Sequence, residues 1–181
     1  ILRCLVGSEM CIRDRFSTHK FEGTPSVNNP HPQKGFLYNG AKNPDLDRFF
    51  LSPSHYALTL YAALIETKRL NDKSLKEFNK DGSVLDMIGS EHSPGHETNG
   101  GSFGQTISQA AGVAWARRRK KEKGLVWLFL SDGEFQEGQT WEALMSMAFH
   151  KISNLKIVVD VNGQQVDGKT CDVMNLEPLL D

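Results

Sequence analysis

Two short polar segments in this chain carry residues of the kind that bind divalent cations. Asp132 and Gly133 follow the apolar run 125–130, and Asn162 follows a second apolar run, 155–161. Neighbouring parallel strands end at the same edge of a sheet, so we expect these side chains to lie close together. A carboxylate and an amide oxygen suit Mg²⁺ or Ca²⁺, and Mg²⁺ completes its coordination with phosphate oxygens and water. Gly133 would let a diphosphate approach the backbone.

Each segment alone also has a simpler interpretation. Asp-Gly and Asn-Gly are common turn sequences, so neither is specific for a metal site. An EF-hand loop starting at Asp132 is excluded, because its sixth position is Glu137 instead of Gly and its twelfth is Ala143 instead of Glu. Only the combination of the two segments indicates a ligand site.

The elements that position these residues follow from the hydrophobic pattern. The continuous apolar run 125–130 is typical of a strand buried on both faces of a parallel sheet, and 155–161 is interpreted as a second buried strand. A helix from Glu137 or Thr140 to about His150 connects them in a right-handed strand–helix–strand unit. We therefore predict an α/β fold, a parallel sheet flanked by helices.

The part of the chain before these strands is predicted to be helical with one long loop. Three helices are expected: 54–70, a short helix capped by Asn71 or Asp72, and one that starts at Ser102. The segment 82–104 is rich in Gly, Ser, His and Pro, and loops of that length inside a domain are usually functional or disordered.

The ends of the chain differ in character from its middle. Residues 1–15 resemble translated adapter sequence, so we expect them to be non-native. Residues 16–47 are interpreted as an irregular approach segment and 48–181 as the domain. Because the chain stops soon after an apparent helix start, we expect it to be a fragment truncated at its C-terminus.

Composition excludes several classes of protein. The 21 Lys and Arg residues balance 22 Asp and Glu residues, so no bulk charge favours nucleic acid or a membrane. The basic run 117–123 is interpreted as the solvated end of a helix, and the three tryptophans as core residues. Three cysteines without a CxxC pair fit a reducing, cytoplasmic location. No apolar run reaches the roughly 20 residues that a membrane span needs.

Four sequence motifs, in order along the chain, resemble those of transketolases. The segments 131–143 and 156–168 together resemble the family's thiamine diphosphate motif, which begins Gly-Asp-Gly and ends in Asn. Upstream, three further segments resemble Ser-x-Gly-His, Thr-Pro-Gly-His and Thr-Gly-Pro-Leu-Gly-Gln of the family: RFFLSPSH at 48–55, SPGH at 93–96 and GSFGQ at 101–105. The resemblance covers about residues 45–181 and implies the family's diphosphate-binding fold.

This resemblance implies a set of metal and cofactor ligands. Asp132 and Asn162 would coordinate Mg²⁺ or Ca²⁺ through side-chain oxygens, and Gln164 through its backbone carbonyl. Gly133 would donate its N–H to the diphosphate of thiamine diphosphate, and His55 would contact the same group.

The resemblance also implies residues closer to the reaction. Gly101 would lie near the aminopyrimidine ring of the cofactor. His96 would lie near the reacting carbon as a catalytic residue, with His92 as an alternative if the loop has another register. Glu137 matches a glutamate that pairs with acidic groups across the subunit interface in the family.

The implied reaction is transfer of a two-carbon ketol unit from a ketose phosphate to an aldose phosphate. Two alternatives stay open: another thiamine diphosphate enzyme, such as deoxyxylulose-phosphate synthase or a 2-oxo acid dehydrogenase component, and a non-catalytic cofactor-binding subunit. The proton relay of the family needs a pyrimidine-binding domain or subunit, which this sequence does not contain. We therefore expect the isolated chain to be inactive and the complete enzyme to be a homodimer or a heterotetramer.

Some positions depart from the family pattern. Ser131 replaces the first Gly of the thiamine diphosphate motif, and Ser54 replaces the Gly of Ser-x-Gly-His. Tyr56 stands where a small residue is common, and an early Gly-His segment is absent from 16–40. These differences concern the choice of substrate more than cofactor binding.

Overall fold

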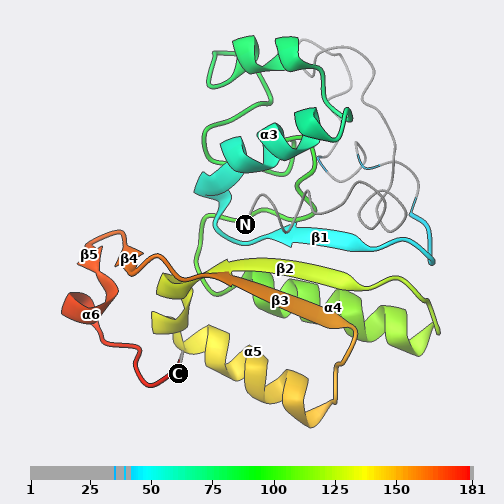
Figure 1. Ribbon diagram of the computed structural model, residues 1–181. Helices are drawn as coiled ribbons and strands as arrows, with labels where there is room; N and C mark the ends of the chain where they lie inside the picture. Colours follow the sequence, from blue (N-terminus) through cyan, green and yellow to red (C-terminus); the bar gives the residue numbers. More distant parts are fainter. Residues whose placement is uncertain (1–34, 36–38, 40–41, 180–181) are drawn as a thin grey trace.

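Three parallel strands form the sheet that positions the site (Figure 1). The computed structural model describes residues 35, 39 and 42–179. The strands β1 (Arg48–Leu51), β2 (Val126–Ser131) and β3 (Leu155–Asp160) pair in the order β1-β2-β3. The prediction of an α/β fold with a parallel sheet is therefore confirmed.

The central strand β2 is apolar because it is buried on both faces, as predicted. Val126, Leu128 and Leu130 are each 0% exposed, and they belong to a core that includes Ile107 and Ala114 of the helix layer. Burying these side chains removes apolar surface from water, so this strand fixes the centre of the domain.

The third strand, β3, was predicted to be buried, but most of its residues are not. Leu155 is buried, but the residues that follow are half-buried or exposed, and Val158 is 36% exposed. The reason is its place in the sheet: β3 is the last strand in the sheet order of the described chain, so only one of its edges is paired.

Helices and short 3₁₀ turns connect the strands. The helices are α3 (Ala57–Glu66), α4 (Thr106–Arg119), α5 (Gly138–Phe149) and α6 (Thr170–Val173). The turns are η2 (Ser54–Tyr56), η3 (Asp72–Glu77) and η4 (Asp132–Gln136), and a small hairpin is formed by β4 (Gln164–Gln165) and β5 (Gly168–Lys169). The predicted helices start later or end earlier than expected, and the short one is a 3₁₀ turn capped by Asn71, whose Oδ1 accepts the Lys73 N–H at 2.9 Å.

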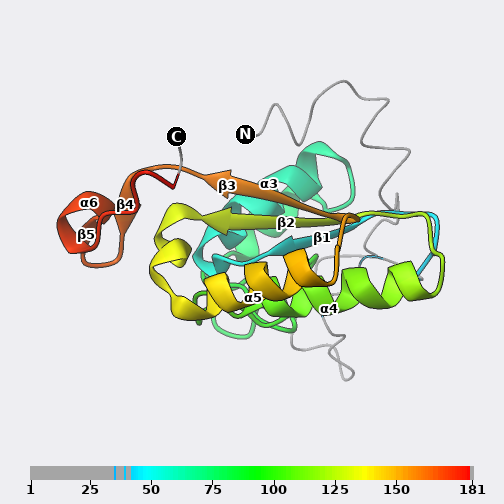
Figure 2. The ribbon, with the colours of Figure 1, turned by 90° about the horizontal axis from the view of Figure 1, so that it is seen from below.

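The helices divide into two groups around the sheet. α4 and α5 pack side by side on one face, whereas α3 lies on the β1 side, away from them (Figures 1 and 2). The small side chains of Ala110 and Ala114 are fully buried and allow α4 to lie close to the sheet. A separate cluster around α3 contains Tyr61, Leu64 and Leu85.

The strand β1 was not predicted, because four residues in the sequence RFFL give too short a pattern. Asp47 holds its start against β2: the carboxylate accepts the Leu125 N–H at 2.7 Å and the Trp127 Nε1–H at 2.8 Å. The long loop between Gly82 and Gly104 contains no helix, as predicted.

Two predictions about surface and core were wrong. Trp115 and Trp141 are 42% and 41% exposed, because each lies on the outward side of its helix. Arg117, predicted in a solvated basic run, is only 4% exposed and donates to the carbonyls of Pro44 and Leu46, both at 2.9 Å. The predicted non-native segment 1–15 lies outside the described residues, as does most of 16–47.

Candidate functional site

The two predicted metal ligands meet at the carboxyl edge of the sheet. Ser131 at the end of β2 pairs in register with Asp160 at the end of β3, so the loops that follow start side by side. Asp132 then accepts the Gly163 N–H on Oδ2 at 2.8 Å, which joins its loop to that of Asn162. The sequence spacing and the parallel register together therefore place the two segments in contact.

Asp132 is a buried carboxylate whose charge is only partly compensated. It is 1% exposed, and besides Gly163 it accepts the Gly133 N–H on Oδ1 at 2.8 Å. Within residues 42–179, no lysine, arginine or histidine forms a salt bridge with it. A buried anion is costly unless it is paired or coordinates a metal. The environment of Asp132 therefore fits a bound cation.

The backbone of Gln164 lies beside Gly133. A Cβ atom added to Gly133 would lie 3.0 Å from the Cβ of Gln165 and 3.6 Å from the carbonyl oxygen of Gln164. A larger residue would crowd this contact, which explains the glycine. Asn162 is tied to the same loop, since its Oδ1 accepts the Gln164 N–H at 2.8 Å.

The donor set at this edge has few charged members. No three His, Cys, Asp or Glu side chains converge within the part of the chain that the structure describes. One carboxylate, one amide oxygen and one backbone carbonyl are all oxygen ligands, the type that Mg²⁺ and Ca²⁺ take. Such a set is incomplete by itself and leaves coordination positions for phosphate oxygens and water. The residues present therefore fit a metal ion that carries a diphosphate.

Glu134 organises the edge, a role that sequence reasoning missed. It is 0% exposed; Oε1 accepts from the Ser52 hydroxyl and from the Gly104 N–H at 3.2 Å, and Oε2 accepts the Ser131 N–H at 3.0 Å. Three loops far apart in the sequence are therefore joined by one carboxylate. The capping-box pattern Ser131-x-x-Glu134 could have indicated the Ser131 contact, but nothing in the local sequence indicates the contacts with Ser52 and Gly104.

His55 and Gly101 lie on neighbouring loops at this edge. The exposed His55 ring contacts Phe103 at 5.8 Å between centroids. Burial lowers the pKa of His55, while the charge of Glu134 opposes this effect. Gly101 has φ +101°, and its loop passes so close to Ser54 that a Cβ on the preceding glycine would overlap that side chain.

The two residues predicted for catalysis have different surroundings. His96 is 2% exposed beneath Gly89, where a Cβ would overlap the imidazole, and its ring faces Tyr61 at 6.3 Å. Neither ring nitrogen has a hydrogen-bond partner among the described residues. Burial lowers the pKa of His96 to about 4, opposed by the charge of Asp86, so the imidazole is neutral near pH 7. Glu137 is exposed at the start of α5.

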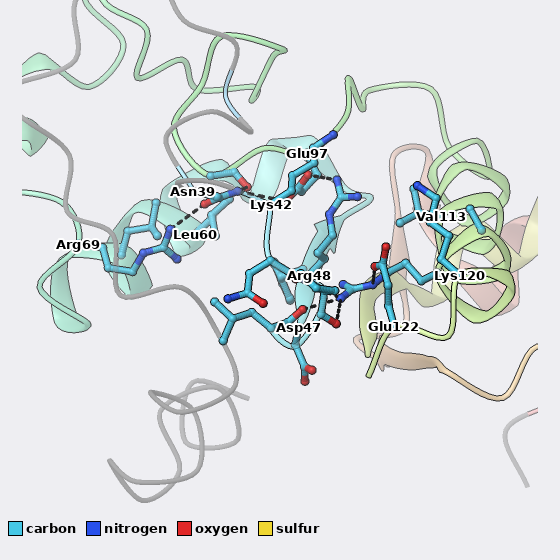
Figure 3. A pocket seen from close by; sticks show the side chains of 18 residues that line it. Asn39, Lys42, Asp47, Arg48, Leu60, Arg69, Glu97, Val113, Lys120 and Glu122 are labelled. Atoms are coloured by element: carbon cyan, nitrogen blue, oxygen red, sulfur yellow. Dashed lines mark hydrogen bonds and ion pairs between the residues drawn. The ribbon is translucent and has the colours of Figure 1, made fainter. Parts of the chain in front are cut away.

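A cavity of about 330 Å³ lies elsewhere, near the start of β1 and the end of α4 (Figure 3). Four of its charged side chains form two pairs: Arg48 with Glu97, and Arg117 with Glu122 at 2.8 Å. This cavity is at the opposite edge of the sheet from Asp132 and does not belong to the candidate site.

Comparison with known proteins agrees with this geometry. The family model described as "Transketolase, thiamine diphosphate binding domain" matches residues 34–177. The chain belongs to the transketolase family. A transketolase family protein of Sinorhizobium fredii is 46% identical over 134 residues, which are 74% of this chain and 48% of that protein. One of the subunits of the apulose-4-phosphate transketolase of Actinobacillus succinogenes is 33% identical, over 76% of this chain and 50% of that protein.

Solved transketolase structures have the same fold. The transketolase of Campylobacter jejuni superimposes with a TM-score of 0.67 at 25% identity, covering 75% of this chain and 23% of that one. The transketolase of Leishmania mexicana gives 0.65 at 27% identity, with 75% and 22% covered. The predicted thiamine diphosphate-binding fold is therefore confirmed, and this chain spans about half the length of the two relatives above. Among the described residues, no helix is long and apolar enough to cross a membrane.

Proposed function

We propose that this chain supplies the metal and diphosphate half of a thiamine diphosphate site in a transketolase-like enzyme. The observation that carries the proposal is the buried carboxylate of Asp132, which has no cationic partner among the described side chains and lies against the loop of Asn162 and Gln164. The reaction would transfer a two-carbon ketol unit from a ketose phosphate to an aldose phosphate.

The proposed metal site uses oxygen atoms from two loops. Asp132, Asn162 and the carbonyl of Gln164 would hold Mg²⁺ or Ca²⁺, which neutralises the diphosphate. The Gly133 N–H would bind a diphosphate oxygen, although in this structure it donates to Asp132, so the two acceptors would share it. His55, whose pKa burial lowers, would contact the diphosphate as a neutral hydrogen-bonding group.

The remaining roles concern the reacting groups. When bound, the cofactor supplies a carbon that adds to a ketose carbonyl and accepts the electrons of the bond that breaks. Gly101 would lie near the aminopyrimidine. His96, neutral near pH 7 and with both nitrogens unpaired among the described residues, would hold or move a proton of a substrate hydroxyl. Glu137, exposed at the start of α5, would face a partner chain.

The proposal includes a partner that completes the site. Two of the relatives are named as one of the subunits of an apulose-4-phosphate transketolase, and this chain spans 50% of each. We infer a pyrimidine-binding domain or subunit, sugar-phosphate substrates, and a homodimer or heterotetramer as the active form. The isolated chain would be inactive, and a cytoplasmic location follows from the cysteine content.

The test is a calorimetric titration of thiamine diphosphate, with and without Mg²⁺, into the full-length protein combined with its pyrimidine-binding chain. We expect binding that depends on Mg²⁺ and is lost in Asp132→Ala. Asp81→Ala is the matched control, because Asp81 is exposed on a distant loop. Binding that ignores both Mg²⁺ and Asp132 would contradict the proposal.

Assays of donor consumption then identify the reaction. Consumption of xylulose 5-phosphate with an aldose phosphate acceptor supports ketol transfer, whereas consumption of pyruvate supports deoxyxylulose-phosphate synthase or a 2-oxo acid dehydrogenase component. Tight cofactor binding without consumption of any donor, in the presence of the partner, would assign a non-catalytic cofactor-binding role.

A further inference from the structure

Tyr56 reaches from the first motif loop to the loop of the proposed metal ligand. Its ring packs at the end of η2 against His55 and Phe129, with centroid distances of 4.6 and 6.1 Å. Its hydroxyl lies 3.0 Å from Asp160 Oδ2 and 2.8 Å from Asn162 Nδ2. The phenol therefore joins two parts of the chain that are more than a hundred residues apart in sequence.

The chemistry of these three groups fixes the direction of each hydrogen bond. A carboxylate only accepts, so the hydroxyl proton of Tyr56 is donated to Asp160. The phenol oxygen is then an acceptor for its other neighbour, and Asn162 must present its NH₂ group to it. Asp160 Oδ2 also lies 3.3 Å from the same Nδ2 and accepts from it. Both contacts favour the same orientation of the amide.

The orientation of the amide decides which of its atoms faces the Gln164 loop. With Nδ2 held by Tyr56 and Asp160, Oδ1 of Asn162 faces the loop of Gln164, whose N–H it accepts at 2.8 Å. A carbonyl oxygen has two lone pairs, so one is left for a cation. The reversed amide would turn its NH₂ toward the Gln164 N–H and toward the cation, which would lose a ligand.

We propose that Tyr56 is a positioning residue that holds the Asn162 amide with its oxygen toward the metal site. This inference rests on the proposed function, because it takes Asn162 as a metal ligand. Partners that orient a ligand are known to change metal affinity although they never touch the metal. Here the partner is a side chain at a position where the transketolase pattern commonly has a small residue.

Ser131 lies beside the second ligand. Its Oγ is 3.4 Å from Asp132 Oδ1, and it also departs from the family pattern, in which this position is Gly. The two departures therefore lie at the two proposed side-chain ligands: Tyr56 contacts Asn162, and Ser131 contacts Asp132.

The test compares Tyr56→Phe with wild type by the Mg²⁺ concentration needed for thiamine diphosphate binding, measured by calorimetry on the full-length protein with its pyrimidine-binding chain. The substitution keeps the ring and removes the hydroxyl. We expect an affinity for Mg²⁺ lower by about tenfold, the lower end of the effect of removing a ligand-orienting partner. The control is Tyr61→Phe, which removes a hydroxyl bonded to the Asp86 carbonyl at 3.2 Å and leaves Mg²⁺ affinity unchanged.

A double-mutant cycle separates orientation from a general loss of structure. In Asn162→Ala the amide is absent, so Tyr56 has no ligand left to orient. We expect Tyr56→Phe to change Mg²⁺ affinity by less than about twofold in that background, a coupling that a merely structural role of Tyr56 would not produce.

Two results would overturn this inference alone: unchanged Mg²⁺ affinity in Tyr56→Phe, or an equal loss with and without Asn162→Ala, while wild-type binding still depends on Asp132. A wild-type protein without Mg²⁺-dependent binding would overturn the proposed function as well.

Discussion

The substitution Glu134→Gln tests whether one buried carboxylate holds the loops of the site together. Both of its oxygens face donors: Oε1 accepts from Ser52 and from the Gly104 N–H, and Oε2 accepts the Ser131 N–H. Glutamine has nearly the same shape but only one acceptor atom. The hydroxyl of Ser52 can rotate to become an acceptor, whereas the two backbone N–H groups cannot.

The magnitude follows from this arrangement. If the glutamine NH₂ takes the place of Oε2, the Ser131 N–H loses its acceptor; if it takes the place of Oε1, the Gly104 N–H loses its acceptor. Either orientation leaves one buried donor unpaired, at a cost of about 1–3 kcal/mol, and weakens the other bonds by removing the charge. We expect the free energy of unfolding to fall by about 2–4 kcal/mol in total.

Urea unfolding of the full-length protein measures this change. With a slope near 2 kcal/mol per molar urea, the midpoint should fall by about 1–2 M. Glu142→Gln is the matched control, because Glu142 is exposed on α5 and should shift the midpoint very little. A Glu134→Gln midpoint equal to that of the control would show that these hydrogen bonds do not stabilise the fold.

Two further predictions concern buried cations and protons. Arg117→Met removes the donor to the Pro44 and Leu46 carbonyls and the 2.8 Å pair with Glu122. The free energy of unfolding, measured in urea, should fall by about 2–4 kcal/mol. Arg119→Met is the control, because Arg119 is exposed and its loss should cost far less. The pKa of His96 is lowered from 6.5 to about 4. As the pH falls, the unfolded chain therefore binds a proton at this residue before the folded chain does. The free energy of unfolding is highest above about pH 6.5 and falls by up to ~3 kcal/mol toward pH 4. In His96→Gln the loss of stability over this interval should be smaller by that amount, and an unchanged pH profile would contradict a buried neutral imidazole.

The closeness of the two proposed metal ligands could be predicted from the sequence because strong local patterns position them. The continuous apolar run of β2 and the apolar run before Asn162 identify two parallel strands, and their register brings the ends together. Their place after those strands was enough to predict that Asp132 and Asn162 lie close together. The burial of β3 was predicted wrongly, since one sequence does not reveal which strand lies at the end of a sheet.

The residues that hold the loops could not be predicted, because their roles depend on contacts between distant segments. Glu134 binds Ser52, 82 residues away, and Tyr56 binds Asn162, 106 residues away. Nothing in the local sequence of a glutamate or a tyrosine indicates such a partner. The burial of His96 beneath Gly89 belongs to the same class, since the covering loop has no periodic pattern.

Asp132 and Glu134 lie two residues apart in η4 and are equally buried, but they have different roles. Glu134 accepts three hydrogen bonds from separate loops, so its charge is compensated by the protein. Asp132 accepts the N–H groups of Gly133 and Gly163, both at 2.8 Å, and a longer contact of 3.4 Å from the Ser131 hydroxyl. It has no salt bridge within the described chain, so compensation by a cation remains favourable. The strands place this turn at the sheet edge through apolar packing, but the difference between the structural carboxylate and the proposed ligand lies in the partners that each one meets. Glu134 joins Ser52 and Gly104 to this turn, whereas Asp132 joins the turn to the loop of Asn162. A metal site of this kind needs both carboxylates. A ligand whose charge is left for a cation must be held in place by neighbouring groups that the protein itself has fully hydrogen-bonded.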